Sequence, residues 1–385
     1  KRMAIIILQA ISVFLFVAKA ASQQYQDGNY SIPTPLFINL DEPVDTRLSL
    51  LHQQFSPTFA EDFRAELVPV RQKLGWLGYN IAKTVLTIYV TIHSYGRFYD
   101  EVESYSQATG LDFGEIVFMN FFYEAGCTSV VGRGADQESI IFGSNLDFPH
   151  ANFIRKYTYL GYFSRNGELV YKANGIYGMV GVLRGQKLNS GYENFALAIN
   201  ARMVERGNII YNLFTGKGFE VVYFVRRVLE MNTYKEALHA LENESLATSA
   251  YYTIGGTWTT GGCIVERSPQ KLHNKTCICD IDPKTNQCDA SSGNSQWYIV
   301  QTNYDRDQPD PTKDPRRTSA ELQITALGQS QFTSQALMNI LANSPVKPAS
   351  TARSLTITTT VCENRPYAPT STLQMIMWND YPPGS

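Results

Sequence analysis

The sequence predicts an α+β protein whose sheets pack face to face with helices on their outer sides. Between about residue 59 and residue 126, apolar side chains recur at helical spacing, as in Phe63, Leu67, Val70 and Leu74. After residue 127, short apolar segments alternate with turn residues, then helical segments follow, then further strands. That order of strands, helices and strands is typical of two packed sheets covered by helices.

The block before residue 127 is expected to be mainly helical. Asp112 and Glu115 form a capping box in front of an apolar segment that begins at Ile116, so a helix is expected to run from there to about Gly126. The segment from Trp76 to Ile92 is unusually apolar and aromatic. It is either a core helix, which we favour, or an exposed surface that contacts a lipid membrane.

The elements of the second block follow from alternation, turn residues and capping signals. Thr233 and Glu236 form a capping box that starts one of its helices. The segment from Gly255 to Gly262 lacks the lysine that follows in a phosphate-binding loop, and we interpret it as a hairpin turn. The expected strands are 128–131, 140–145, 157–163, 169–173, 179–183, 195–200, 250–254, 263–266, 297–302, 354–361 and 373–377, and the other expected helices are 218–231 and 334–342.

Composition and charge place the chain among globular proteins. Of its 385 residues, 44% are hydrophobic and 18% are charged, enough to form the core of one large domain or two smaller ones. The net charge of −2 gives no reason to expect a nucleic-acid partner. Lys1 and Arg2 precede an apolar run that ends at Ala18, so residues 1–21 are expected to be a secretory signal peptide.

Entry into the secretory pathway permits glycosylation and disulfide bonds. Sequons for N-glycosylation begin at Asn29, Asn243 and Asn274. The six cysteines are Cys127, Cys263, Cys277, Cys279, Cys288 and Cys362. With Cys127 kept as a free thiol, the other five cannot all pair within one chain. The group of His273, Cys277, Cys279 and Cys288 is either a zinc site or, as we favour, a set of disulfides and free cysteines, so neither a metal nor a cofactor is expected.

The stretch from Cys127 to Asp147 carries the strongest signal for chemistry. Its two apolar segments are joined by a polar turn near 135–138, which places position 127 opposite about position 146. A thiol and a carboxylate then lie at the same end of a hairpin. Small residues precede the cysteine, so its thiol is a candidate to attack the Gly126 carbonyl and to release Cys127 as a new N-terminal residue.

A cysteine nucleophile needs a base, and an N-terminal cysteine has one in its own α-amine, whose ordinary pKa is about 7.7–8.0. The usual base is histidine. His150 lies close to the hairpin in sequence, but we favour a loop position for it, and His239 is expected to be packed or exposed on a helix. The alternative for Cys127 is a buried cysteine that is inert or disulfide-bonded.

Two polar groups further along the chain are candidates to complete a site. Asn303, at the end of an expected strand, is suited to donate a hydrogen bond to an oxyanion. Arg316 is suited to hold a carboxylate or a carbonyl in fixed geometry. Read alone, these two residues belong to a strand end and a charged loop.

Several motifs taken together resemble the family of acid ceramidases and N-acylethanolamine acid amidases. They occur in the family's order and span most of the chain after the signal peptide: Cys127-Thr-Ser-Val-Val131, Gly143-Ser-Asn-Leu-Asp-Phe-Pro149, Ile154-Arg-Lys156, Tyr252-Thr-Ile-Gly-Gly256, Thr302-Asn-Tyr-Asp305 and Arg316-Arg-Thr-Ser-Ala320. The second and the last of these favour the amidase branch.

The resemblance implies an N-terminal-nucleophile hydrolase with a four-layer αββα core. It implies autocatalytic cleavage between Gly126 and Cys127, into a helical α-subunit of residues 22–126 and a β-subunit of residues 127–385. The implied substrates are fatty-acyl amides, N-acylethanolamines first and ceramide as the alternative. We expect a lysosomal or secreted enzyme whose helical subunit contacts a membrane transiently. A catalytically inactive lipid-binding homologue is the alternative of a different class.

The resemblance also assigns a role to each candidate residue. Cys127 is the nucleophile, Asp147 orients its α-amine, Asn303 contributes to the oxyanion hole and Arg316 lines the site. The chain departs from the family pattern at two positions, because Ser144 stands where the family has an arginine and Ala201 where it has a glutamate.

A cation near a cysteine favours its thiolate. The arginine that the family has at position 144 would supply one there. Arg133, in the same hairpin, and Arg155, a few residues beyond it, are candidates to replace that cation.

Overall fold

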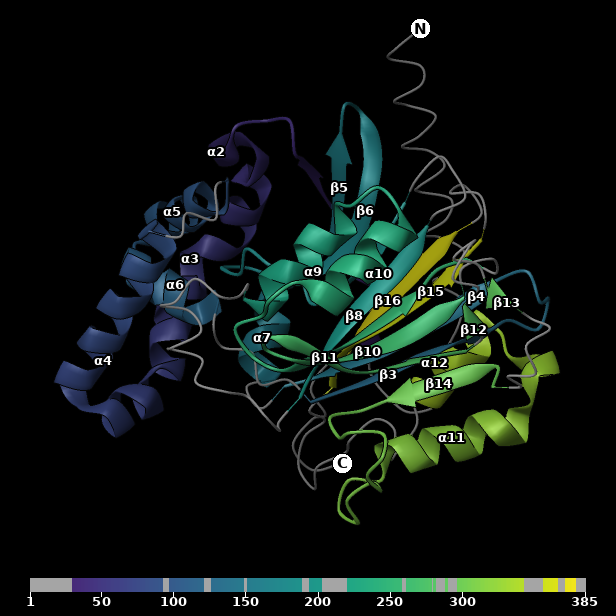
Figure 1. Cartoon of the computed structure of the whole chain (residues 1–385). Helices are drawn as coiled ribbons and strands as arrows, with labels where there is room; N and C mark the ends of the chain where they lie inside the picture. The colour runs from purple at the N-terminus through teal and green to yellow at the C-terminus, as the bar shows by residue number, and fades with distance from the viewer. Residues whose placement is uncertain are drawn as a thin grey trace, which may run out of the picture.

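The computed structural model describes residues 30–92, 97–120, 126–148, 151–188, 194–202, 220–257, 261–278, 280–281, 288–289, 296–342, 356–365 and 371–378. Within these residues the protein is a mixed α+β structure with two large sheets. A group of helices between residues 44 and 120 lies on one side of them (Figure 1). These helices are α2 (Val44–Arg47), α3 (Ser49–Glu66), α4 (Val68–Ile92), α5 (Arg97–Thr109) and α6 (Phe113–Asn120).

The first sheet has six strands, and all of its neighbours are antiparallel. In spatial order they are β1 (Tyr30–Ser31), β16 (Thr372–Trp378), β15 (Thr356–Asn364), β4 (Ile140–Asp147), β3 (Gly126–Arg133) and β14 (Tyr298–Gln301). The central β3–β4 hairpin therefore lies between β15 and β14, which come from much later in the chain.

The second sheet has eight strands, and only its β2–β5 pair is parallel. In spatial order they are β11 (Lys271–Cys277), β10 (Gly262–Ser268), β9 (Ala250–Gly255), β8 (Phe195–Ala201), β7 (Arg184–Lys187), β6 (Glu168–Ile176), β5 (Thr158–Arg165) and β2 (Leu36–Asn39). A separate pair is formed by β12 (Asp280–Ile281) and β13 (Cys288–Asp289).

The two large sheets face each other. Strands β3 and β4 pack against β8 and β9, and apolar side chains fill the space between them, among them Val131, Phe142, Ala196 and Ile264. Helices α9 (Val221–Leu229) and α10 (Tyr234–Asn243) pack on the eight-stranded sheet. Helices α11 (Arg316–Leu327) and α12 (Ser334–Ala342) pack on the six-stranded sheet. The predicted arrangement of facing sheets with outer helices is confirmed.

Local signals located the starts of two helices correctly. The Thr233–Glu236 capping box is present at the start of α10. At the start of α6, the Asp112 backbone N–H donates to the Glu115 carboxylate, while the Asp112 side chain accepts from Gly114 N. The structure describes α6 as far as Asn120, and residues 121–125 lie outside the described residues. Gly126, where the helix was expected to end, is the first residue of β3.

The expected strand at residues 179–183 is wrong. This segment is an irregular loop, and the strand β7 starts only at Arg184. Gly178 has a φ of 86°, which a strand does not tolerate, and Gly181 lies so close to Val222 that a Cβ atom there would be 2.6 Å from the Val222 carbonyl carbon. The apolar pattern reflects burial of the loop under the start of α9.

Helix α4 contains the segment for which two interpretations were open. Its backbone is interrupted at Gly75, which has a φ of 67° and a ψ of 166°. Tyr79 and Val90 are buried, but Trp76 is 80% exposed and Leu77 is 64% exposed. The interpretation as a core helix is therefore wrong for one face of α4. Among the described residues, no helix combines the length and apolarity that a membrane span requires.

The structure gives the state of four of the six cysteines. Cys263 and Cys277 form a disulfide that joins β10 and β11, so Cys277 is not available as a zinc ligand and the zinc interpretation is wrong for it. Cys127 and Cys362 are buried free thiols. The signal peptide, Asn29, His150 and Cys279 lie outside the described residues.

A buried ionic cluster joins the helical block to the sheets. Glu101 on α5 accepts hydrogen bonds from Arg47 on α2 at 2.6 Å and from Arg226 on α9 at 2.6 Å. Arg226 also donates to the Val180 carbonyl and lies over the Phe98 ring, 4.7 Å from the ring centre. The cluster connects residues that the resemblance assigns to two different subunits.

Candidate active site

The β3–β4 hairpin places the predicted cysteine and aspartate at one end. Cys127 pairs with Leu146 and Gly126 pairs with Asp147, so the register predicted from the turn is confirmed. Paired residues on neighbouring strands point to the same face of a sheet, and successive residues alternate. Cys127 therefore points to the face opposite to that of Asp147.

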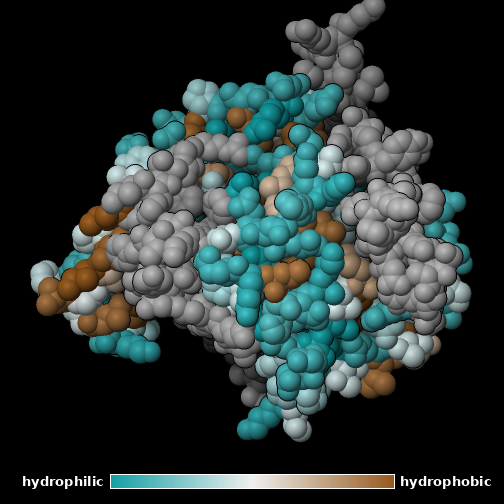
Figure 2. Space-filling view, viewed as in Figure 1, coloured by the Kyte–Doolittle hydropathy of each residue, from teal (hydrophilic) through white to brown (hydrophobic). Residues whose placement is uncertain are grey.

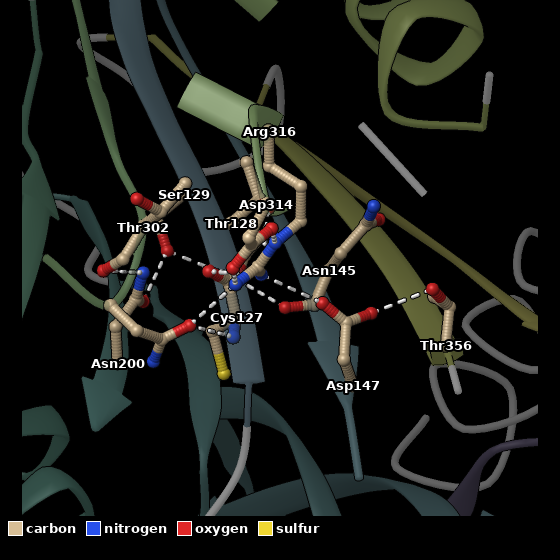
Figure 3. Close-up of polar contacts among 12 residues, drawn as sticks. Cys127, Thr128, Ser129, Asn145, Asp147, Asn200, Thr302, Asp314, Arg316 and Thr356 are labelled. Atoms are coloured by element: carbon tan, nitrogen blue, oxygen red, sulfur yellow. Dashed lines mark hydrogen bonds and ion pairs between the residues drawn. The ribbon is translucent and has the colours of Figure 1, made fainter. Parts of the chain in front are cut away.

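Arg316, the first residue of α11, connects the candidate residues (Figure 3). Its guanidinium donates to the Asp147 carboxylate at 3.1 Å, the Asn303 amide oxygen at 3.0 Å and the Cys127 carbonyl at 2.9 Å. Asp314 holds the same guanidinium through two bonds of 2.6 and 2.8 Å. Four segments that are distant in sequence thus meet at one buried cation. Since Arg316 starts a helix, its interpretation as part of a charged loop is wrong.

Asn303 holds the backbone of the cysteine. The Cys127 N–H donates to the Asn303 amide oxygen at 2.9 Å, and the Asn303 amide nitrogen donates to the Ala201 carbonyl at 2.8 Å. In this uncut chain the Cys127 nitrogen is a peptide nitrogen. The same position would be occupied by the α-amine once the bond to Gly126 was broken. Asn303 is therefore placed to orient that nitrogen, whereas its contribution to an oxyanion hole stays a prediction.

Asp147 is buried, and its surroundings act on its charge in opposite directions. Burial raises the pKa of its carboxyl group above the ordinary value of 3.8. Arg316, the hydroxyl of Thr356 at 2.6 Å and Arg184 oppose that rise because each favours the carboxylate. The pKa stays raised, so Asp147 loses its proton less readily than an exposed aspartate.

The stability of the fold should consequently depend on Asp147 in a defined pH range. The pKa of the Asp147 carboxyl group is raised in the folded protein. The stabilising contribution of Asp147 is therefore fully present below its pKa in the unfolded chain, and it is lost as the pH rises through its pKa in the folded protein. We expect Asp147→Asn to gain stability relative to its parent from about pH 4 to pH 7, measured by urea unfolding of an uncut Cys127→Ala protein. The exposed Asp307→Asn is the control, and a difference between Asp147→Asn and its parent that does not change with pH would contradict this expectation.

The face to which the sulfur points has its own polar network. Figure 3 shows the Cys127 sulfur directed away from Arg316. Two residues further along β3, the Ser129 hydroxyl donates to the Asn200 amide oxygen at 2.6 Å and lies 3.2 Å from the Ser144 hydroxyl. Asn200, in turn, donates to the carbonyls of Gln301 and Thr302, which directly precede Asn303. This network fixes the end of β14 against β3 and β8.

Sequence reasoning missed Asp314, Thr356 and Asn200. Asp314 lies two residues before Arg316, and a carboxylate at that spacing was a signal that could have been used. Thr356 and Asn200 are polar residues inside buried strands, where an unexplained polar side chain usually has a partner. Their partners could not be identified without the register of the sheets.

The two arginines proposed to replace the family's cation lie elsewhere. Arg133 pairs with Ile140 at the far end of the hairpin, six residues from Cys127 and so roughly 20 Å away along the strand. Arg155 on α7 (Ala151–Tyr157) donates to the Thr356 carbonyl at 3.1 Å. It therefore supports the strand next to Asp147. This distance excludes Arg133 as the cation that favours the Cys127 thiolate.

One group of side chains away from Cys127 has the composition of a metal site. Glu266, His273 and Asp305 offer ligand atoms within 4.8 Å of one another. However, Arg202 binds both carboxylate oxygens of Asp305, at 2.7 and 2.8 Å, and Tyr251 donates to one of them at 2.6 Å. These bonds give the Asp305 carboxylate its partners without a metal, and they anchor the loop that follows Asn303.

Comparisons with known proteins agree with this geometry. No protein-family model matches the chain. It is 29% identical to the N-acylethanolamine-hydrolyzing acid amidase of Rattus norvegicus over 81% of this chain and 82% of that protein. It is 31% identical to the corresponding protein of Cavia porcellus over 68% of this chain and 69% of that one, and 29% identical to the acid ceramidase of Homo sapiens over 65% and 64%.

The solved structures include a match of the same kind. The Caenorhabditis elegans N-acylethanolamine-hydrolyzing acid amidase ortholog aligns with a TM-score of 0.51 at 25% identity, covering 66% of this chain and all of that chain. Fold and sequence together make this protein a homologue of amide hydrolases. The chain belongs to the family of N-acylethanolamine acid amidases and acid ceramidases.

Proposed function

We propose that this protein is an autoprocessed cysteine amidase that hydrolyses fatty-acyl amides, built on the four-layer αββα core of N-terminal-nucleophile hydrolases. One observation carries the proposal: the backbone nitrogen of a free, buried Cys127 is held by Asn303 at 2.9 Å, beside the Arg316–Asp147 pair. The backbone of any buried residue needs hydrogen-bond partners, but at Cys127 these partners are the Asn303 amide and the Arg316 guanidinium, and the same guanidinium binds Asp147.

Maturation begins at the Gly126–Cys127 bond. The Cys127 thiol adds to the Gly126 carbonyl, the C–N bond breaks, and the nitrogen takes the thiol proton. A thioester between Gly126 and the Cys127 sulfur results, and water hydrolyses it to a free carboxylate at Gly126 and a free thiol. Asn303 then holds the new α-amine, and Asp147 is the proposed second partner. The two products are an α-subunit of residues 22–126 and a β-subunit of residues 127–385.

Amide hydrolysis uses the thiol and the α-amine of Cys127. The α-amine of Cys127 takes the thiol proton, and the thiolate attacks the acyl carbonyl. Hydrogen-bond donors, with Asn303 as a candidate, stabilise the oxyanion. The α-ammonium gives its proton to the departing amine, which leaves a thioester. Water then attacks the thioester while the α-amine takes a proton, and the fatty acid is released.

The proposed substrates are N-acylethanolamines, since the relatives that match most of this chain are named for hydrolysing them. Acid ceramidases match a shorter part of it, so ceramide is the second candidate. We also propose a lysosomal or secreted location, with a signal peptide at residues 1–21. Of the glycosylation candidates, Asn243 and Asn274 are exposed in the structure.

The test is the intact mass of the secreted protein before and after incubation near pH 5, together with fatty-acid release from mixed acyl amides. We expect two fragments that meet between Gly126 and Cys127, and release of fatty acid from N-acylethanolamines. A chain that stays uncut and releases no fatty acid would instead identify a lipid-binding homologue without catalysis.

The exposed face of α4 is the proposed contact with the membrane that supplies the lipid. Trp76, Leu77 and Ile81 lie on it, the last 55% exposed, and they form an apolar area at the edge of the molecule (Figure 2). Large apolar side chains that are exposed together on a helix are typical of surfaces that enter the interfacial region of a bilayer.

Removing two of these side chains should weaken binding to vesicles. We expect Trp76→Ser with Leu77→Ser to lose about 3 kcal/mol of burial, or roughly a hundredfold in partitioning. Co-sedimentation with phosphatidylcholine vesicles that contain an anionic phospholipid measures the loss. Leu322→Ser is the matched control, because Leu322 is 67% exposed on α11. An equal loss in the control would contradict a specific role for α4.

A further inference from the structure

Arg184 is a fully buried arginine that the proposed mechanism has not used. It lies on β7 of the eight-stranded sheet and is 0% exposed. It pairs with Ala198 and Asn174. Ala198 packs between the sheets, and Asn174 reaches Met375 of the opposite sheet. Since paired residues share a face, Arg184 points toward the six-stranded sheet.

The guanidinium of Arg184 reaches the hairpin that carries the candidate nucleophile. It donates to the Ser144 carbonyl at 2.9 Å. Ser144 pairs with Ser129, which is two residues, or roughly 7 Å, along β3 from Cys127. The guanidinium comes from the sheet that the sulfur faces, whereas Arg316 packs on the other side.

The side-chain charges around Arg316 favour a second cation. Arg316 carries one positive charge and contacts two carboxylates, the buried Asp147 and the partly exposed Asp314, so this group has a net charge of −1. When the α-amine takes the thiol proton, the thiolate places a negative charge on the sulfur's side of the site, while the positive charge lies on the nitrogen beside Asn303. A buried negative charge is costly unless a positive charge compensates it.

We propose that Arg184 is a positioning residue of this site, the cation on the sulfur's side that holds β4 and balances the negative charge around Cys127 and Asp147. The proposal rests on the amidase function proposed above. It also accounts for Ser144, because a guanidinium from β7 occupies the neighbourhood of the position where the family has an arginine.

The electrostatic effect of Arg184 on its neighbours agrees with this role. Arg184 lowers the pKa of Asp147, against the larger effect of burial. The other charged groups near Asp147 are Arg316 and Asp314, with Arg155 behind Thr356. Near Arg184 itself lie Lys172 on β6 and the Cys362 thiol on β15, whose pKa burial raises to about 12 while both cations oppose that rise.

The first experiment needs no activity. In an uncut Cys127→Ala background, urea unfolding at a series of pH values locates the pH at which the contribution of Asp147 is lost, by comparison with Asp147→Asn. We expect Arg184→Met to move that pH upward, because the carboxylate loses a stabilising cation. Arg267→Met is the matched control, since Arg267 is also fully buried in the eight-stranded sheet but binds carbonyls at the end of α10. An unchanged pH in Arg184→Met, or an equal shift in the control, would overturn the proposal.

The second experiment uses the active protein. We expect Arg184→Met to lower kcat/KM about tenfold for each unit by which the acid limb of the pH profile moves upward, with a smaller change in KM. Adding Ser144→Arg should restore part of the loss by returning a guanidinium to the hairpin. A loss of activity that matches Arg267→Met, with no shift in the profile and no rescue, would overturn the role of Arg184.

Two further comparisons separate a failure of the proposal from misfolding of the variant and from a failure of the amidase function. If Arg184→Met does not fold, Arg184→Lys and Arg184→Gln replace it, and only the glutamine variant is expected to shift the pH at which the contribution of Asp147 is lost. Equal values in the two variants would overturn the proposal. If the wild-type protein neither cuts itself nor releases fatty acid, the amidase function fails, whereas the unfolding experiment still decides the electrostatic role of Arg184.

Discussion

Cys127→Ala is expected to remain a single uncut chain and to lose fatty-acid release by roughly 10⁴-fold or more. The reason is that one sulfur performs both reactions: it attacks the Gly126 carbonyl once and the substrate carbonyl in every turnover. Cys127→Ser retains an attacking oxygen, but a hydroxyl gives up its proton far less readily than a thiol, so we expect slow cutting and little turnover. Intact mass and fatty-acid release measure the two effects separately.

Cys362→Ala is the matched control for this prediction. Cys362 is the other buried free cysteine among the described residues, and burial raises the pKa of its thiol to about 12. It lies on β15, where it pairs with Phe142 within the apolar layer between the sheets. We expect this variant to cut itself and to turn over substrate. If Cys127→Ala were still cut at Gly126, an external protease would have to be responsible, and the autocatalytic mechanism would be wrong.

The part of the site that depends on local sequence could be predicted. The turn between β3 and β4 has a polar sequence in which the Asp136 carboxylate accepts from Glu138 N and Ser139 N, and this turn sets the register of the hairpin. Once the turn is located, the alternation of a strand places Cys127 opposite Leu146. No knowledge of distant residues is needed for that step. The same is true of the Thr233–Glu236 capping box.

The part that depends on packing between distant segments could not be predicted from the chain alone. Arg184 acts on β4 only because β7 faces it across the core, and the sequence around Arg184 contains no signal for that contact. The strand expected at 179–183 failed for a similar reason. Its apolar residues are buried beneath α9, and periodicity cannot distinguish a buried loop from a buried strand.

The same limitation explains α4. Its apolar pattern is consistent with a core helix, and nothing in the local sequence indicates which face lacks a partner. The structure places Tyr79 against the core and leaves Trp76 exposed. The apolar and aromatic composition of this segment allowed a membrane surface, but it could not decide between that surface and a core helix.

Glu101→Leu is expected to destabilise the fold by about 3–5 kcal/mol, because it leaves the guanidinium groups of Arg47 and Arg226 buried without their shared carboxylate. Burial alone would raise the pKa of Glu101, but Arg226 and Arg47 outweigh it and hold the pKa below the ordinary value of 4.5. The contribution of Glu101 is therefore fully present above about pH 4.5 and is lost only as the pH falls through the folded pKa. At the proposed working pH near 5, the cluster remains ionised.

The position of this cluster gives the prediction a second readout. Glu101 lies in the proposed α-subunit and Arg226 in the proposed β-subunit, so the ion pair crosses the boundary that cleavage would create. We expect the two fragments of cut Glu101→Leu to separate on size-exclusion chromatography at lower urea than those of the wild type. Glu103→Gln, an exposed change on the same helix, should leave both unfolding and association unchanged. Equal behaviour of Glu101→Leu and Glu103→Gln would show that packing of α5, without the ionic cluster, holds the helical block to the sheets.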